Sequence, residues 1–264
     1  MKNYLKGTIF SGLLLLSFAC NKKENHQSKQ QNNTTENFRV DSLSLSDSKK
    51  VFDSVTVDYY SRLLVFPDLK DKTLLDSIYF DKKGLADFSA KGLTDNFTKE
   101  TKAYYDFVNK NRKNADIHYK QTWEYASDMK MKSYENGYLH IQYYKKETEG
   151  KTRGTADYTE KVFDIQNNKK VELTDITTAS KEKLSTILQE NFDKNDKKIK
   201  FADLTVKKIV PNNNFYFDKN NLYFHYNMNV FMPGYPMGDI VVAVSWDKLE
   251  GQINPAFKER MKIN

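Results

Sequence analysis

The stretch NFYFDKNNLYFHYNMNVFMPGYPMGDIVVAVSWDKLEGQINP, from Asn214 to Pro255, decides the fold. Two aromatic runs flank the polar turn Asp218–Asn221, and this arrangement predicts a β-hairpin. Apolar and polar residues alternate over Leu222–Val230, so this strand should have one face on a core and one polar face. The run Ile240–Trp246 is almost entirely apolar and β-branched, which predicts a central strand.

The loop FMPGYPMG, Phe231–Gly238, separates these two strands and holds two prolines and two glycines. Proline lacks an N–H donor and glycine tolerates positive φ, so an ordered loop or bulge is expected. Aromatic and methionine side chains on a stiff loop lose little entropy on docking, although the same side chains could instead pack on their own sheet. The candidate partner-binding residues are Phe231, Met232, Tyr235, His225 and Asn229.

Helical spacing of apolar residues predicts two helices in the first half of the chain, at 71–79 and 85–111. Ser180 is the predicted N-cap of a third helix. A short helix at 248–253 is expected to begin after Asp247 and to end at Pro255. Further strands are predicted at 117–132, 138–146, 155–165 and 170–173.

The turn Glu135–Gly137 allows the strand register to be tested. A two-residue loop would place Ile141 opposite Lys132 and mix the two faces, whereas a three-residue loop places Ile141 opposite Met131 and keeps one face apolar. We therefore predict a three-residue loop with Gly137 in the left-handed conformation.

Helix-plus-hairpin units occur before and after about residue 160, and this order predicts an α+β fold. We expect antiparallel β-sheets with packed helices, arranged as two interlocked lobes at 49–160 and 161–264.

The N-terminus carries the pattern of an export signal. Lys2 and Lys6 precede a short apolar segment that falls below the about 20 residues of a spanning helix. Leu16–Cys20 resembles a lipobox, which implies a signal at 1–20 and lipidation of Cys20; an ordinary secretory signal is the alternative. The polar, low-complexity segment 21–48 is expected to be a disordered tether. The protein is therefore expected to be lipid-anchored in the cell envelope, at the outer membrane, facing either the periplasm or the surface.

The net charge of +7 is spread along the chain, which indicates a solvated surface rather than a nucleic-acid-binding face. The only cysteine is Cys20, so no internal disulfide is expected. No histidine pair has the spacing of metal ligands, and Ser180-x-x-Lys183 lacks the other motifs of serine acyltransferases. We expect no enzyme activity, metal or cofactor.

The order of elements in Asn214–Pro255 resembles a bacterial domain-of-unknown-function family. That family occurs in the extracytoplasmic half of RsiV-type anti-sigma factors and in a lobe attached to PdaC-type polysaccharide deacetylases. Gly154–Asp175 is similar to its glycine turn, its F-D hairpin and its L-T-D run before a helix. The resemblance implies an α+β envelope domain that binds proteins, with lysozyme as the ligand in RsiV-type members.

The expected function is therefore a non-catalytic, protein-binding domain whose partner is a lysozyme-type muramidase. The alternatives are an envelope enzyme or glycan-binding module acting on peptidoglycan or another polysaccharide, and a purely structural lipoprotein. A glycan-binding surface would be indicated by an exposed Trp123 or Trp246, whereas the strand pattern predicts that both are buried. The sequence leaves the oligomeric state open.

Overall fold

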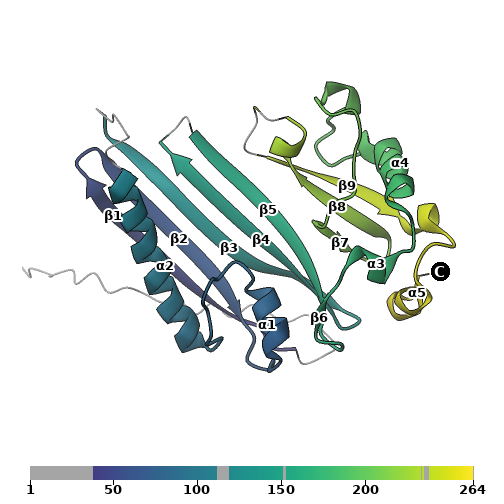
Figure 1. Cartoon of the computed structure of the whole chain (residues 1–264), viewed down its shortest axis with the longest axis horizontal. Helices are drawn as coiled ribbons and strands as arrows, with labels where there is room; N and C mark the ends of the chain where they lie inside the picture. Colours follow the sequence, from purple (N-terminus) through teal and green to yellow (C-terminus); the bar gives the residue numbers. More distant parts are fainter. Residues whose placement is uncertain (1–37, 112–118, 151–152, 233, 235–237, 264) are drawn as a thin grey trace, which may run out of the picture.

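The computed structural model describes residues 38–111, 119–150, 153–232, 234 and 238–263. A six-stranded sheet has the strand order β1-β2-β3-β4-β5-β6, and a three-stranded sheet has the order β7-β8-β9 (Figure 1). The strands of the first sheet are β1 (Asp41–Phe52), β2 (Val55–Val65), β3 (Gln121–Glu135), β4 (Tyr138–Glu149), β5 (Arg153–Asp164) and β6 (Lys169–Lys170). Those of the second are β7 (Phe215–Phe217), β8 (Asn221–Asn227) and β9 (Asp239–Ser245).

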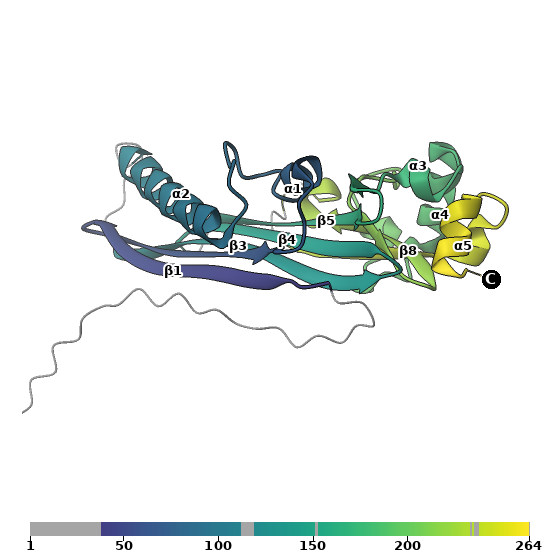
Figure 2. The same ribbon diagram turned by 90° about the horizontal axis from the view of Figure 1, so that it is seen from below.

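Two helices cover one face of the first sheet (Figure 2). They are α1 (Lys72–Ile78) and α2 (Ala90–Asn111), and they lie in the connection between β2 and β3. This connection lets β2 and β3 run parallel, whereas all the other paired strands are antiparallel. The core beneath the helices includes alternate residues such as Leu139 and Ile141 of β4, because successive side chains of a strand point to opposite faces.

The second lobe packs its three-stranded sheet against helices of the C-terminal half. These helices are α3 (Leu173–Ile176), α4 (Lys181–Phe192) and α5 (Pro255–Met261), with 3₁₀ turns at Phe201–Asp203, Met228–Val230 and Trp246–Leu249. The Ser180 side chain caps α4 by accepting from the Lys183 N–H, as predicted. Leu222, Phe224 and Tyr226 of β8 are buried on one face, as predicted. The predicted continuation of this strand to Val230 is wrong, because β8 ends at Asn227 and Met228–Val230 form a 3₁₀ turn. The observed elements confirm the α+β class.

The hairpin of β3 and β4 has the predicted pairing of Ile141 with Met131, but a β-bulge produces it instead of a three-residue loop. Ile141 lies opposite Met131, but Glu135 pairs with Tyr138, so the loop has two residues. The register shifts between Met131 and Ser133, and this bulge supplies the extra residue that the sequence analysis assigned to the loop. Gly137 is left-handed as predicted, with φ of 75°, and Asn136 is left-handed too, with φ of 53°.

Several predicted boundaries are wrong. The predicted strand at 170–173 is reduced to the two residues of β6, and the predicted helix at 248–253 is the 3₁₀ turn Trp246–Leu249. Residues 41–48 of the predicted tether form the first part of β1, because Leu43 and Leu45 pack against the core beneath the helices. The lobe boundary between 160 and 161 falls inside β5, which pairs with β4 along its whole length. Pro255 begins α5 instead of ending a helix, since a proline at the first helical position sacrifices no hydrogen bond. The predicted export signal at 1–20 and its Cys20 lie outside the described residues.

Arg260 of α5 joins the C-terminal lobe to the first sheet. Its Nη1 and Nη2 atoms donate to the Asp164 carboxylate at 2.8 Å and 3.0 Å, and its Nε donates to the Asn136 carbonyl at 2.7 Å. The guanidinium also lies 3.9 Å from the centroid of the Tyr138 ring. This planar group therefore makes several contacts that an ammonium would not reproduce.

We expect Arg260→Lys to lower the free energy of unfolding by about 2 kcal/mol, because one point-like ammonium replaces the two-pronged contact with Asp164. Chemical denaturation at neutral pH measures this loss. Lys258→Ala is the matched control, since Lys258 is exposed on the same helix. Equal stability of Arg260→Lys and the unchanged chain would contradict this role for Arg260.

Among the described residues, no helix is both long enough and apolar enough to span a membrane.

Candidate functional site

The second sheet meets the outer edge of β5 through asparagine side chains. Asn227 accepts from the Tyr158 N–H at 2.8 Å, and both Asn227 and Asn214 donate to the Tyr158 carbonyl, at 3.2 Å and 2.9 Å. Asn214 also accepts from the Glu160 N–H. Two side chains thus satisfy backbone groups that a strand edge would otherwise leave unpaired, and they fix the second sheet against β5.

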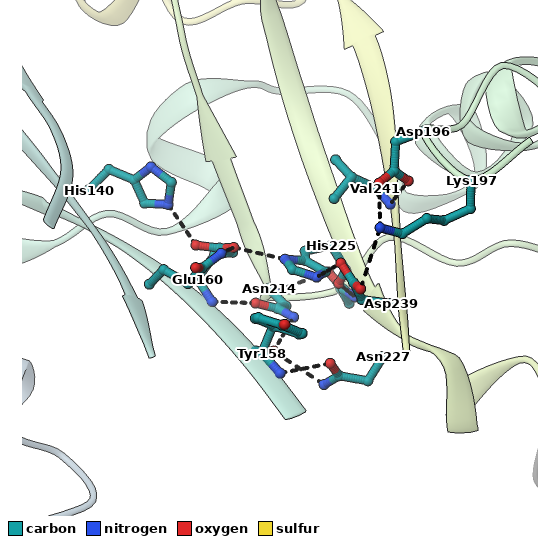
Figure 3. Close-up of polar contacts among 12 residues, drawn as sticks. His140, Tyr158, Glu160, Asp196, Lys197, Asn214, His225, Asn227, Asp239 and Val241 are labelled. Carbon is teal, nitrogen blue, oxygen red and sulfur yellow. Dashed lines mark hydrogen bonds and ion pairs between the residues drawn. The ribbon is translucent and has the colours of Figure 1, made fainter. Parts of the chain in front are cut away.

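Glu160 is the centre of a buried polar cluster between the two sheets (Figure 3). Its carboxylate oxygens lie 2.7 Å from His140 Nε2 and 2.8 Å from His225 Nδ1. Gln142 donates to the same carboxylate at 2.7 Å. On its other side, His225 Nε2 lies 3.1 Å from Asp239 of β9. The cluster therefore runs from β4 through β5 and β8 to β9.

The hydrogen bonds around Glu160 determine its protonation. Burial by itself would raise its pKa, but the contacts with His140, His225 and Gln142 outweigh burial and lower the pKa to about 2. Glu160 is therefore a carboxylate at neutral pH. The Glu160 side chain is only 2% exposed. Hydrogen bonds from these neighbours therefore replace those that water would make to the carboxylate, and they offset the cost of burying its charge.

Aromatic rings hold both imidazoles in place. The His140 ring stacks on Tyr216 of β7 at a centroid distance of 4.6 Å, and the His225 ring stacks on Tyr158 of β5 at 5.2 Å. Each stack crosses from one sheet to the other. Because these stacks and the hydrogen bonds of Glu160 join strands of both sheets, the cluster connects the first sheet to the second.

This placement corrects the prediction for His225. The alternation of β8 puts His225 on its polar face, as expected, but that face lies against β5, and His225 is 2% exposed. It is not available to a partner at the surface.

Sequence reasoning missed Glu160 and His140. The available signal was the antiparallel pairing of β4 with β5, which sets Gln142 directly opposite Glu160.

The predicted binding loop is divided between core and surface. Phe231 is 2% exposed and packs against Phe192 and Tyr226, at ring-centroid distances of 5.4 Å and 4.8 Å, so its prediction as an exposed anchor is wrong. Met232 is half-buried against the same core, Asn229 is exposed, and Tyr235 lies outside the described residues. Val230, which was not a candidate, is 56% exposed.

Hydrogen bonds stabilise the described part of this loop. The Met228 N–H donates to the Gly238 carbonyl at 2.9 Å, and the Phe231 and Met232 N–H groups donate to the Met228 carbonyl at 3.0 Å and 2.9 Å. The Phe231 carbonyl accepts from both the N–H and the hydroxyl of Thr205. The segment Met228–Met232 is thus held at both ends while Asn229 and Val230 face outward.

Trp123 and Trp246 are 6% and 5% exposed, as the strand pattern predicts. This burial counts against a glycan-binding surface built on either indole ring. Among the described residues, no group of three or more histidine, cysteine, aspartate or glutamate side chains is placed to hold a metal ion.

Two solved structures share this fold. A DUF3298 family protein from Bacteroides fragilis NCTC 9343 aligns with a TM-score of 0.68 at 21% identity, over 87% of this chain and 100% of that one. A DUF3298 family protein from Pseudomonas aeruginosa PAO1 aligns with a TM-score of 0.57 at 13% identity, over 84% of this chain and 97% of that one. No family model and none of the curated proteins matches the sequence. The chain therefore has the fold of the DUF3298 proteins, a bacterial family of unknown function, as the sequence resemblance had indicated in outline.

Proposed function

We propose that this chain is a lipid-anchored protein of the bacterial cell envelope whose α+β domain binds a protein partner without catalysing a reaction. The lipobox-like sequence before Cys20 supports the anchor. The resemblance of Asn214–Pro255 to the extracytoplasmic half of RsiV-type proteins supports the binding role. That resemblance makes a lysozyme-type muramidase the leading partner.

The observation that carries the proposal is the segment Met228–Met232. Its backbone is tied to Gly238 and Thr205, and Phe231 fixes it to the core, yet Asn229 and Val230 point outward. A loop that is rigid before it binds loses little conformational entropy on docking. An exposed aliphatic side chain beside a polar one on such a loop is a suitable docking contact for a protein surface.

Binding to a panel of lysozymes tests the proposal. We expect the chain from Asn21 to Asn264 to bind at least one of them with a dissociation constant below about 1 µM, and to inhibit bacterial lysis, at physiological salt. Calorimetry and a lysis assay measure these two effects. A fragment beginning at residue 49 is unsuitable, because it would remove most of β1.

Variants then locate the contact. Tyr235→Ala and Val230→Asp should each weaken binding about tenfold or more, whereas Tyr119→Ala should leave it unchanged. Tyr119 is a matched control because it is an aromatic residue, 64% exposed, two residues before β3. No binding across the panel would reject a muramidase partner, and binding that neither loop variant weakens would reject this loop as the contact.

A further inference from the structure

Each nitrogen of the His225 ring faces a carboxylate oxygen (Figure 3). Nδ1 lies 2.8 Å from Oε1 of Glu160 in β5, and Nε2 lies 3.1 Å from Oδ2 of Asp239 in β9. An ionised carboxylate accepts hydrogen bonds and donates none, whereas a neutral imidazole donates through only one of its nitrogens. Both contacts are therefore hydrogen bonds only if the ring carries both protons.

Both acids are in the ionised form. The hydrogen bonds around Glu160 hold its pKa at about 2. The Asp239 side chain is 21% exposed, and its Oδ1 lies 3.7 Å from the Lys197 ammonium. Contact with water and a nearby cation both favour the ionised carboxylate. Neither acid therefore supplies a proton to its contact with His225, and the ring has to supply both.

His140 contacts the Glu160 carboxylate in a different way. Its Nε2 lies 2.7 Å from Oε2 of Glu160, and no described residue forms a hydrogen bond with its Nδ1. One proton, on Nε2, satisfies this contact, so the His140 ring can stay neutral. Gln142 donates to the same carboxylate as a neutral amide. Of the described side chains that contact this carboxylate, His225 is then the one that carries positive charge.

The other titratable side chains of the cluster do not replace this charge. Lys197, from the segment after α4, lies 3.2 Å from Asp196 and 3.7 Å from Asp239, so its ammonium is paired with these two acids. The rings of Tyr158 and Tyr216 stack on the two imidazoles, and burial raises the pKa of both hydroxyls, so both tyrosines are neutral.

Burial makes a charged His225 ring favourable. His225 and Glu160 are each 2% exposed, so neither group is compensated by water. A neutral ring would leave the Glu160 carboxylate buried without a cation in contact, and an unpaired buried charge is costly.

We propose that His225 holds both ring protons at neutral pH, and that the contact between the two sheets weakens when rising pH removes one of them. Without that proton, a lone pair of the ring faces a carboxylate oxygen, and an attractive contact becomes repulsive. His225 lies two residues before Asn227, which binds the edge of β5 at Tyr158. A change at the ring therefore acts on the strand that connects the second sheet to β5.

The direction of this pH dependence follows from the charge. The fold favours the protonated ring, so its stabilisation is present at acidic to neutral pH and is lost as the pH rises through the point at which the folded ring releases its proton. Glu160 acts in the opposite direction, since its own stabilisation is lost on acidification. The contacts are internal to the chain, so this pH dependence holds whether or not a partner protein binds.

Long-range ¹H–¹⁵N NMR of the histidine rings, on the chain from Asn21 to Asn264, shows which ring nitrogens carry a proton. At pH 7 we expect both nitrogens of His225 to be protonated, and His140 to be protonated on Nε2 alone. An unprotonated nitrogen on His225 at pH 7 would overturn the inference.

The variant Asp239→Asn tests the cause of this protonation. Asparagine has nearly the same shape as aspartate, and its amide can donate to Nε2, so the ring no longer needs a proton there. We expect His225 to release its proton at a pH about one unit lower, or more, than in the unchanged chain. Asp53→Asn is the control, because the Asp53 side chain is 99% exposed, and it should leave this titration unchanged. Equal titration of His225 in Asp239→Asn and in the unchanged chain would also overturn the inference.

Hydrogen exchange of the Tyr158 N–H, which donates to Asn227, measures the contact between the sheets. Its protection factor, which corrects for the pH dependence of exchange itself, should fall about tenfold as the His225 ring loses its proton, and at a lower pH in Asp239→Asn. The Ile165 N–H, which donates to the turn between β3 and β4, should keep its protection over the same range. Constant protection of Tyr158 while His225 titrates would overturn the proposed weakening.

Discussion

Replacing Glu160 with glutamine is expected to lower the free energy of unfolding by about 3 kcal/mol at neutral pH. Folding lowers the pKa of this carboxyl from 4.5 to about 2, and each unit of such a shift corresponds to about 1.4 kcal/mol of stability. Glutamine keeps the shape of the side chain but loses the charge that His140 and His225 contact. Urea denaturation of both chains at neutral pH measures the difference.

The effect of Glu160→Gln should depend on pH in a defined direction. Because the pKa of Glu160 is lower in the folded than in the unfolded chain, its stabilisation is fully present above about pH 4.5 and is lost as the pH falls through about 2. The difference in stability between the two chains should therefore shrink on acidification. Comparison with Glu190→Gln controls for the general loss of an acidic group. A difference that stays constant between pH 7 and pH 2.5 would contradict the assignment.

Replacing Phe231 with alanine is expected to lower the free energy of unfolding by about 3–5 kcal/mol, the usual cost of removing a buried phenylalanine side chain. Phe231 is 2% exposed and contacts the rings of Phe192 and Tyr226. The neighbouring change Val230→Ala should alter stability by less than about 0.5 kcal/mol, because Val230 is 56% exposed.

Thermal and urea denaturation of both variants check this contrast. Similar small effects of the two changes would mean that Phe231 lies at the surface, and would contradict its burial against Phe192 and Tyr226. A large loss from Phe231→Ala also explains why Phe231 is unsuitable for locating a binding surface, since any loss of partner binding would follow from loss of the fold.

Local signals in the sequence determined most secondary-structure elements. Ser180 caps α4 because its hydroxyl accepts from an N–H three residues ahead, and this is a property of the local chain. The alternation in β8 and the left-handed Gly137 were predicted for similar reasons. The pairing of Ile141 with Met131 was also correct, since only that register keeps one face apolar. These features depend on residues that are close in the sequence or are joined by one turn.

Only the tertiary structure decided which polar residues meet. Glu160 contacts His140, 20 residues away, and His225, 65 residues away, on strands of two different sheets. Alternation in β8 shows that one face is polar, but it does not show whether that face meets water or β5. The same limit applies to Phe231, since a Pro- and Gly-rich loop can direct an aromatic ring inward or outward. Burial depends on partners distant in the sequence, and these partners are present only once the two sheets have packed together.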